Sequence, residues 1–283
     1  MPLPIVFSHG NGFPAGTYRR LFERWRAAGH AVHAVDKFGH DPAYPVTSNW
    51  PRLRDQLIHF IEREVGGPVL LVGHSLGGLL SLLAACRRPE LAAGLVMLDS
   101  PVVTGWRAHG VRMAKATGLI GRVSPGKVSR RRRHEWAHRD EVLPHFAAKP
   151  GFARWDPRVL QDYVEAGFEL HGEGARLAFR REVETRIYDT LPHHFATLLR
   201  RHPPACPVAF LAGTRSSEMR QGGFASSRAL AGERFEWIEG SHLFPMERPD
   251  ETAERVLALL ARMDAGRRAP PAASARPAAA PPL

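Results

Sequence analysis

The chain has 283 residues, of which 44% are hydrophobic, and this fits one α/β domain with an insertion better than two independent domains. No run of about 18 apolar residues occurs, so we expect no membrane span, and no leader of the secretory kind precedes the first predicted strand, so we expect a cytoplasmic protein. The formal net charge is +11, but arginine supplies nearly all of the positive charge and no nucleic-acid-binding motif accompanies it, so we expect no nucleic-acid partner.

The first predicted strand, at residues 3–7, runs into a glycine-containing loop at residues 8–14 with the sequence SHGNGFP. A glycine-rich loop in this place can supply a backbone N–H that stabilises an oxyanion. We expect the donor to be the amide of Asn11, with Gly12 as the alternative, and we expect His9 to support the loop by hydrogen bonding. The same residues also fit a simple turn between a strand and a helix.

The most informative motif is GHSLG at residues 73–77, between a predicted strand at 68–72 and a predicted helix at 76–87. A serine in this context is typical of a nucleophile elbow, in which a strained turn exposes the hydroxyl and only small neighbours let strand and helix approach each other. We therefore expect Ser75 to be a nucleophile. The amide of Leu76 begins the helix, where unpaired donors favour an anion, so it is expected to bind the same oxyanion.

Residues 103–185 interrupt the alternation of strands and helices and are predicted to form several short helices, an inserted helical cap. A run of four arginines at 130–133 fits phosphate binding or a bias in composition, and its role stays open. We expect most aromatic residues here to form the core of the insertion and two or three to line an apolar pocket above Ser75. These aromatic residues are Trp106, Trp136, Phe146, Phe152, Trp155, Tyr163, Phe168 and Phe179.

A serine nucleophile needs a base, and His242 is the candidate, in the sequence GSHLFPMERP at residues 240–249. It follows a predicted strand at 234–238 and precedes a predicted helix at 249–263, so its ring can reach over the carboxyl ends of the strands. The nucleophile comes first in the chain and the base last, which is the order of such sites in α/β folds.

The whole pattern predicts an α/β fold with a doubly wound, mostly parallel sheet of about six strands. We assign residues 1–102 and 186–263 to the core, 103–185 to the inserted cap and 264–283 to a disordered tail rich in proline and alanine. The strands are expected at residues 3–7, 31–35, 68–72, 94–98, 207–211 and 234–238. The helices are expected near residues 16–28, 50–64, 76–87, 186–201, 222–231 and 249–263.

These motifs resemble the α/β-hydrolase superfamily, and within it the small bacterial serine hydrolases and esterases, over most of residues 1–102 and 205–262. The resemblance implies a parallel sheet, a Ser–His–acid triad and a cap, while the two leading strands usual in the superfamily look absent. Haloalkane dehalogenases and epoxide hydrolases resemble this layout but carry Asp where this chain has Ser75. The stretches that carry the resemblance are SHGNGFP, VDKFGH, VGHSLGG, LDSP and GSHLFPMERP.

The third member of the triad departs from the commonest pattern of the superfamily, which places an Asp shortly after the penultimate strand. Here that position holds Ser216, which cannot stabilise an imidazolium as a carboxylate does. Asp99 ends the strand at 94–98, in a place where some serine esterases of the superfamily carry their acid, and Glu218 lies further along the later loop. We favour Asp99 and keep Glu218 as the alternative acid, in which case Asp99 is a structural cap.

The expected reaction is cleavage of a carboxylic ester or thioester through an acyl-enzyme, in which His242 accepts the Ser75 proton and two backbone amides hold the oxyanion. The expected partner is a small-molecule substrate with an apolar acyl group of short to medium length. We expect no cofactor and no metal, and Cys86 and Cys206 fit core thiols. The alternatives are a cofactor-free lyase or perhydrolase on the same triad, or a non-catalytic ligand receptor. The oligomeric state stays open.

Overall fold

The computed structural model describes residues 2–268 of the chain, and six of its strands form one parallel sheet. In the order of the sheet these are β2 (Val32–Ala34), β1 (Ile5–Ser8), β3 (Val69–His74), β4 (Ala92–Leu98), β8 (Val208–Gly213) and β9 (Phe235–Ile238). Along the chain, β1 is followed by β2 at the edge of the sheet, and the next connection crosses back over β1 to β3. This topology confirms the predicted doubly wound α/β fold.

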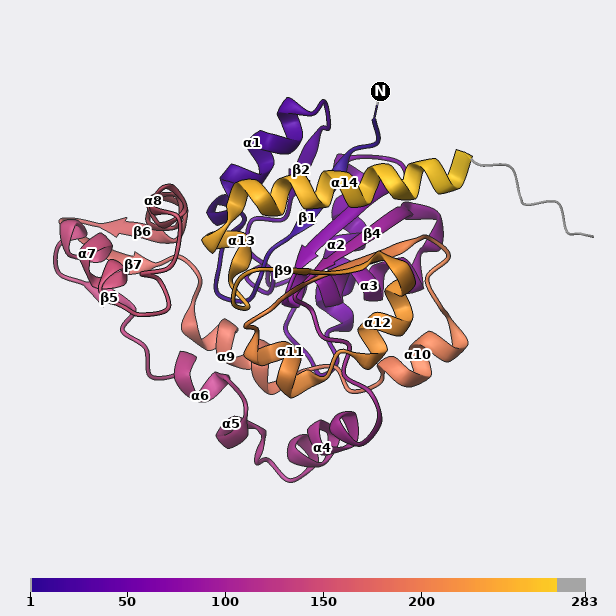
Figure 1. Cartoon of the computed structure of the whole chain (residues 1–283). Helices are drawn as coiled ribbons and strands as arrows, with labels where there is room; N and C mark the ends of the chain where they lie inside the picture. Colours follow the sequence, from indigo (N-terminus) through magenta and orange to yellow (C-terminus); the bar gives the residue numbers. More distant parts are fainter. Residues whose placement is uncertain (1, 269–283) are drawn as a thin grey trace, which may run out of the picture.

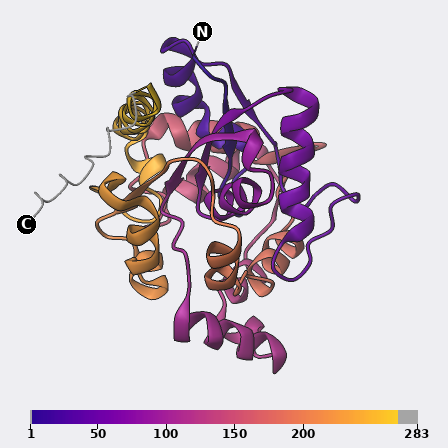
Figure 2. The ribbon, with the colours of Figure 1, turned by 90° about the vertical axis from the view of Figure 1, so that its right-hand side faces the viewer.

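Helices cover both faces of the sheet, as the turned view in Figure 2 shows. One face carries α2 (Pro51–Glu64), α3 (Leu76–Arg87), α9 (Arg181–Asp189), α10 (Phe195–Arg201) and α12 (Ala225–Ala231). The other carries α1 (Arg19–Ala27) and α14 (Pro249–Arg268). Successive strand residues point to opposite faces, so Leu71 joins the first hydrophobic cluster while Leu70 and Val72 join the second.

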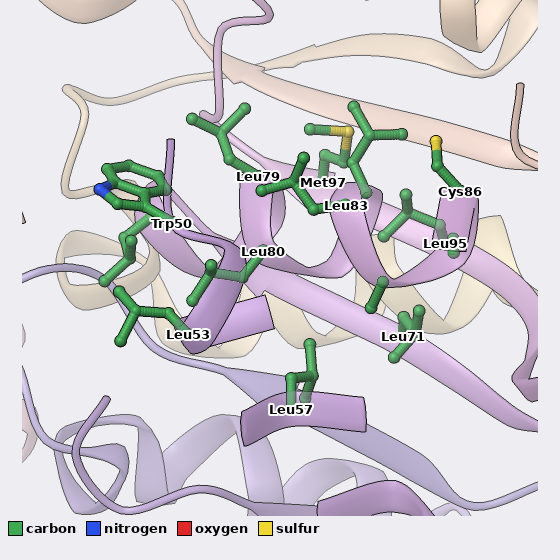
Figure 3. Close-up of a cluster of buried hydrophobic side chains, with 14 of the residues drawn as sticks. Trp50, Leu53, Leu57, Leu71, Leu79, Leu80, Leu83, Cys86, Leu95 and Met97 are labelled. Carbon is green, nitrogen blue, oxygen red and sulfur yellow. The ribbon is translucent and has the colours of Figure 1, made fainter. Parts of the chain in front are cut away.

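The cluster in Figure 3 holds α3 against the sheet close to the GHSLG motif. Leu71, Leu95 and Met97 project from β3 and β4 and are almost fully buried. Side chains of α2 and α3 cover them, among them Leu57, Leu80 and Leu83. Because α3 is buried along nearly its whole length, the first turn of this helix is fixed relative to the ends of β3 and β4.

The insertion consists of an arm of short helices and a small α+β unit (Figure 1). The arm contains α4 (Gly105–Ala116), α5 (Ile120–Val123) and α6 (Gly126–Ser129). The second unit contains α7 (Val142–Ala147), α8 (Pro157–Ala166) and an antiparallel sheet of β5 (Glu135–Trp136), β7 (Gly174–Leu177) and β6 (Phe168–His171). The sequence predicted helices alone, because strands of two to four residues are too short to show an alternating pattern.

Most aromatic residues of the insertion pack against one another, as predicted. Tyr163 lies at the centre, with ring centroids of Phe146 and Phe152 at 5.3 and 5.6 Å. Phe13, from the loop after β1, contacts Tyr163 at 5.8 Å and so joins this cluster to the core. Trp106 is the exception, because 76% of its surface is exposed. The remaining members of the cluster are Trp136, Trp155 and Phe168.

Three predicted boundaries differ from the structure. The helix expected at 186–201 is two helices, α9 and α10, because Pro192 lies between them and cannot donate a helical hydrogen bond. The helix expected at 222–231 begins later, as α12 at Ala225, because Gly223, whose φ of 78° is unsuited to a helix, ends a preceding helix, α11 (Ser217–Gly222).

The third difference concerns the tail, because α14 continues to Arg268 and residues 264–268 are therefore helical. Alanine and arginine favour a helix, and the first proline comes only at Pro270. The rest of the predicted tail lies outside the described residues. The remaining short elements are η1 (Ala15–Tyr18), η2 (Pro89–Leu91), η3 (Arg139–Glu141), η4 (Gly232–Arg234) and α13 (Phe244–Glu247).

The run of four arginines is largely engaged within the protein. Arg130 pairs with Asp189 at 2.9 Å, and Arg132 pairs with the buried Glu184 at 2.9 Å. Arg133 pairs with Glu141 at 2.7 Å. These ion pairs hold the end of the arm to α9 and η3, so three of the four guanidinium groups have a partner in the fold.

Candidate active site

Ser75 lies at the turn between β3 and α3, in a backbone conformation that is rare for a residue with a side chain. Its φ is 53° and its ψ is −115°. Glycines make the close approach possible, because a Cβ on Gly77 would clash with the carbonyl of Ser8 and a Cβ on Gly78 with the side chain of Ser100. The Ser75 hydroxyl is thereby held outside the helix, as a nucleophile elbow requires.

Ser75, His242 and Asp99 form a continuous line of hydrogen bonds. The His242 Nε2 lies 3.0 Å from the Ser75 Oγ, and the His242 Nδ1 lies 2.7 Å from the Asp99 Oδ2. The Asp99 side chain is fully buried, and its backbone φ of 45° turns it away from the end of β4. The Ser75 amide donates to the Leu98 carbonyl at 2.9 Å, which ties the turn that carries the serine to the strand that carries the acid.

Asp99 is anchored by two further donors, one at the end of β8 and one in the loop that follows. The Gly213 amide donates to Asp99 Oδ1 at 2.7 Å, and the Ser216 hydroxyl donates to Asp99 Oδ2 at 2.5 Å. The Ser216 oxygen itself accepts from the Met219 amide at 3.0 Å. Ser216, at the position where the sequence led us to look for an acid, thus contacts the acid-bearing residue directly.

Glu218, the alternative acid, lies beside the same imidazole but does not hydrogen-bond to it. Its Oε2 is 3.9 Å from the His242 Nδ1, and 42% of its side chain is exposed. Burial alone would lower the pKa of His242, but the hydrogen bond and charge of Asp99, with the charge of Glu218, raise that pKa above its ordinary value. The geometry places Asp99, and not Glu218, in direct contact with the imidazole.

The loop after β1 brings Asn11 to the same two cavities as Ser75. The Gly10 carbonyl accepts from the Phe13 amide at 3.2 Å and from the His9 Nδ1 at 2.8 Å. The His9 Nε2 accepts from the Phe38 amide at 2.9 Å, and burial lowers the pKa of His9 to about 4, so this ring stays neutral. Because a trans peptide holds its N–H opposite its carbonyl, the fixed Gly10 carbonyl also fixes the direction of the Asn11 N–H.

Two cavities meet at Ser75. One, of about 200 Å³, is lined mainly by apolar side chains, and the other, of about 300 Å³, has a mixed lining. Five residues line both: Asn11, Ser75, Tyr188, Glu218 and His242. The apolar cavity is also lined by Leu76, Leu79, Trp50, Val103, Val111, Pro125, Ile187, Leu191 and Phe195, and the mixed cavity by Gly10, Phe13, His74, Arg154, Ser217 and Ser241.

The prediction that two or three aromatic residues of the insertion line the pocket is wrong. None of the eight lines either cavity among the described residues, since six pack with each other, Phe179 packs against His40 and Trp106 is exposed. The lining residues of the Phe, Tyr and Trp type are Phe13, Trp50, Tyr188 and Phe195, which lie outside residues 103–185. Tyr188 belongs to no motif, so the sequence offered no signal for it beyond its place in a predicted helix.

Asp99, Glu218 and His242 are also the group of potential metal ligands that residues 2–268 bring within 4.8 Å of one another. Asp99 and His242 already hydrogen-bond to each other, and the other imidazole nitrogen faces the Ser75 hydroxyl. This arrangement suits the transfer of a proton from a hydroxyl better than the binding of a cation.

The sequence matches the model of the "Alpha/beta hydrolase family" over residues 5–255. The chain belongs to the alpha/beta hydrolase family. Among curated alpha/beta hydrolases it is 31% identical over 183 residues to a monoglyceride lipase homolog of monkeypox virus, covering 59% of this chain and 60% of that protein. It is 26% identical over 233 residues to the mouse sn-1-specific diacylglycerol lipase ABHD11, covering 80% and 70% of the two chains.

Solved structures of alpha/beta hydrolases share the fold at low sequence identity. The crystal structure of E-2-(acetamidomethylene)succinate hydrolase superposes with a TM-score of 0.68 at 19% identity, covering 92% of this chain and 91% of that one. The match to the viral monoglyceride lipase homolog spans 60% of that protein's length. Within residues 2–268 of this alpha/beta hydrolase, no helix is both long and apolar enough to span a bilayer.

Proposed function

We propose that this protein is a serine hydrolase that cleaves a carboxylic ester or thioester through an acyl-enzyme. The observation that carries the proposal is the hydrogen-bonded line from Ser75 Oγ through His242 to Asp99, with distances of 3.0 and 2.7 Å. In this proposal Ser75 is the nucleophile, His242 the base and Asp99 the acid. The hydrolase and lipase names of the relatives support the same reaction class.

In the proposed cycle the His242 Nε2 accepts a proton twice, first from Ser75 and later from water, and gives it up each time. As Ser75 Oγ attacks the carbonyl carbon, its proton passes to Nε2, and Asp99 stabilises the resulting imidazolium. The amides of Asn11 and Leu76 bind the oxyanion. When the bond to the leaving group breaks, the departing oxygen or sulfur takes the proton from Nε2. Water then attacks the acyl-enzyme, gives a proton to Nε2 and releases the acid, and the proton returns to Ser75.

The two cavities fit the two halves of an ester. We place the acyl group in the apolar cavity, where Val111 and Pro125 of the inserted cap face Leu79 of the core. We place the leaving group in the mixed cavity, where Arg154 and Ser217 offer polar contacts. The small apolar volume of about 200 Å³ supports a preference for short to medium acyl groups.

The location is part of the same proposal. Cys86 and Cys206 form no disulfide with each other. Thiols persist in reducing compartments, which is consistent with a cytoplasmic enzyme.

A fluorophosphonate probe and p-nitrophenyl butyrate test the proposal together. We expect one probe molecule to attach per chain, at Ser75, and we expect ester turnover to begin with a burst of p-nitrophenol close to one per chain. Absence of both labelling and turnover from folded protein would refute the proposed function. Labelling at Ser75 without ester turnover would favour the alternative of a lyase or perhydrolase on the same residues.

A further inference from the structure

A second line of hydrogen bonds, buried at its Tyr18 end, leads to the backbone of His242. The Tyr18 hydroxyl lies 2.7 Å from the His74 Nδ1, and the Gly10 amide donates to the Tyr18 oxygen at 3.0 Å. At the other end, the His74 Nε2 lies 2.9 Å from the backbone carbonyl of His242. Tyr18 is 1% exposed and His74 is 0% exposed, so the two contacts of the Tyr18 hydroxyl are shielded from water, while the contact with the His242 carbonyl is part-buried.

The chemistry of the end groups fixes every proton in this second line. A carbonyl only accepts, so the His74 Nε2 must carry the ring proton, and the Nδ1 of a neutral ring then accepts. The Gly10 amide only donates, so the Tyr18 oxygen accepts from it and sends its own proton to Nδ1. Burial, with the nearby His242, lowers the pKa of His74 to about 3, which keeps this ring neutral throughout the physiological range.

The line connects the three segments that must be aligned for the proposed reaction. Gly10 precedes Asn11, His74 precedes Ser75, and the carbonyl at the far end belongs to the base itself. The fit leaves no spare room, since a Cβ on Gly10 would lie 2.7 Å from the His74 Nδ1 and 2.9 Å from the Tyr18 hydroxyl. The sequence alone did not predict the contact between Tyr18 and His74, because the two residues are 56 positions apart and belong to no common motif.

We infer that Tyr18 and His74 are positioning residues of the hydrolase, which hold the backbone of His242 so that its imidazole bridges Ser75 and Asp99. The inference rests on the proposed function. Tyr18 lines neither cavity, and His74 borders only the mixed one. Their effect passes through the His242 carbonyl to the imidazole, and through the Gly10 amide to the loop that presents the Asn11 N–H.

Tyr18→Phe is the most direct test, because it removes one oxygen and keeps the ring. It leaves the Gly10 amide and the His74 Nδ1 without partners, so the His74 ring is no longer held in one orientation. The charged or titratable groups that face His242 are Asp99 after β4, Glu218 on α11 and His74 at the end of β3. A looser His242 contacts Asp99 less well, which lowers the pKa of its imidazole.

We therefore expect Tyr18→Phe to lower kcat about tenfold, the effect of losing one well-formed hydrogen bond, with little change in KM. We also expect the acid limb of the kcat/KM profile to move to lower pH. Tyr44→Phe is the matched control, because the Tyr44 hydroxyl also lies 2.9 Å from a histidine Nδ1, that of His59, but on an exposed surface. It should leave both readouts unchanged. Folded Tyr18→Phe protein with wild-type kcat and acid limb would overturn the inference.

A measurement on the unaltered protein remains decisive if Tyr18→Phe does not fold. In ¹⁵N spectra of histidine-labelled wild-type protein, we expect His74 to show the neutral form with Nε2 protonated, unchanged between pH 5 and 9. A His74 ring that titrates in this range, or carries its proton on Nδ1, would overturn the inference. This readout does not depend on turnover, so it stands apart from the failure of the proposed function, which would appear as inactive wild-type protein.

Discussion

The Ser216 hydroxyl lies 2.5 Å from Asp99 Oδ2, the same carboxylate oxygen that the His242 Nδ1 contacts at 2.7 Å. The Ser216 oxygen accepts from the Met219 amide, so its proton is directed to the carboxylate. The residue at the commonest acid position of the family thus supports a carboxylate that comes from the neighbouring strand. A short polar side chain is required there, because a second carboxylate would face Asp99 at like charge.

The first prediction concerns this support. Ser216→Ala removes one of three donors to Asp99, and we expect kcat to fall about tenfold, since a hydrogen bond to a charged group contributes roughly 1.5–3 kcal/mol and the remaining donors recover part of it. Steady-state kinetics with p-nitrophenyl butyrate would measure the change. Ser226→Ala is the control, because the Ser226 hydroxyl pairs with Thr104 at 2.6 Å, outside the triad. Equal effects of the two variants would contradict the proposed support.

The second prediction separates the two candidate acids. Asp99→Asn should lower kcat by about 10⁴ with little change in KM, because the amide favours the wrong imidazole tautomer and cannot stabilise the imidazolium. Glu218→Gln should cost far less, since Glu218 Oε2 stands 3.9 Å away and only adds charge. The two variants are compared by active-site titration and kcat. The reverse ranking would make Glu218 the acid and return Asp99 to a structural role.

The same pair of variants predicts a shift in pH dependence. The base must be neutral to accept the serine proton, so activity rises with pH through the pKa of His242. Asp99 and Glu218 both raise that pKa, and removing either charge moves the acid limb of kcat/KM to lower pH, more for Asp99→Asn than for Glu218→Gln. If the acid limb of the kcat/KM profile of Asp99→Asn lies at the same pH as in the wild type, a group other than His242 controls the pH dependence.

The third prediction concerns the nucleophile. Ser75→Ala should abolish ester turnover and fluorophosphonate labelling while the thermal unfolding transition stays close to that of the wild type. Ser81→Ala is the control, because Ser81 is a fully buried serine further along α3 that lines neither cavity. It should keep both activities. More than a few per cent of residual turnover in Ser75→Ala would rule out Ser75 as the nucleophile.

The fourth prediction concerns acyl length. Val111 lines the apolar cavity from α4, so Val111→Trp should fill part of it and shift the preference of the enzyme toward shorter acyl chains. A series of p-nitrophenyl esters, from acetate to decanoate, measures this as ratios of kcat/KM. Val128→Trp, on the same arm but 73% exposed, should leave the ratios unchanged. A wild-type preference for long-chain triglycerides would contradict the placement of the acyl group.

The sequence allowed prediction of the parts of the site that depend on local pattern. The strand, glycines and helix around Ser75 are neighbours in the chain, and His242 is picked out by its position after the last strand. The choice between Asp99 and Glu218 was left open because it depends on how the ends of β4 and β8 lie side by side. That adjacency is a property of the sheet order, which the spacing along the chain does not specify.

Other features escaped prediction because their partners are far apart or their segments are short. The contact of Tyr18 with His74 joins η1 to the end of β3, and neither residue stands out by itself. The strands of the inserted unit have four residues or fewer and show no clear period. Trp155 and Tyr163 pack against Phe13 from the loop after β1, a long-range contact that turns the aromatic cluster of the insertion away from the cavities.

Because the proposed acid directly follows β4, the end of β8 and the loop after it contribute the Gly213 amide and the Ser216 hydroxyl to Asp99, and no acid. The residues that follow on α11, Gln221 and Gly222 among them, face the apolar cavity instead. The first turn of α11 therefore acts on the proposed acid and base, through the charge of Glu218 and the Met219 amide, while its last turn borders the proposed acyl site. Substitutions at Gln221 reach the substrate cavity without touching the Ser75–His242–Asp99 line, which makes this position the natural place for directed evolution of acyl preference to begin.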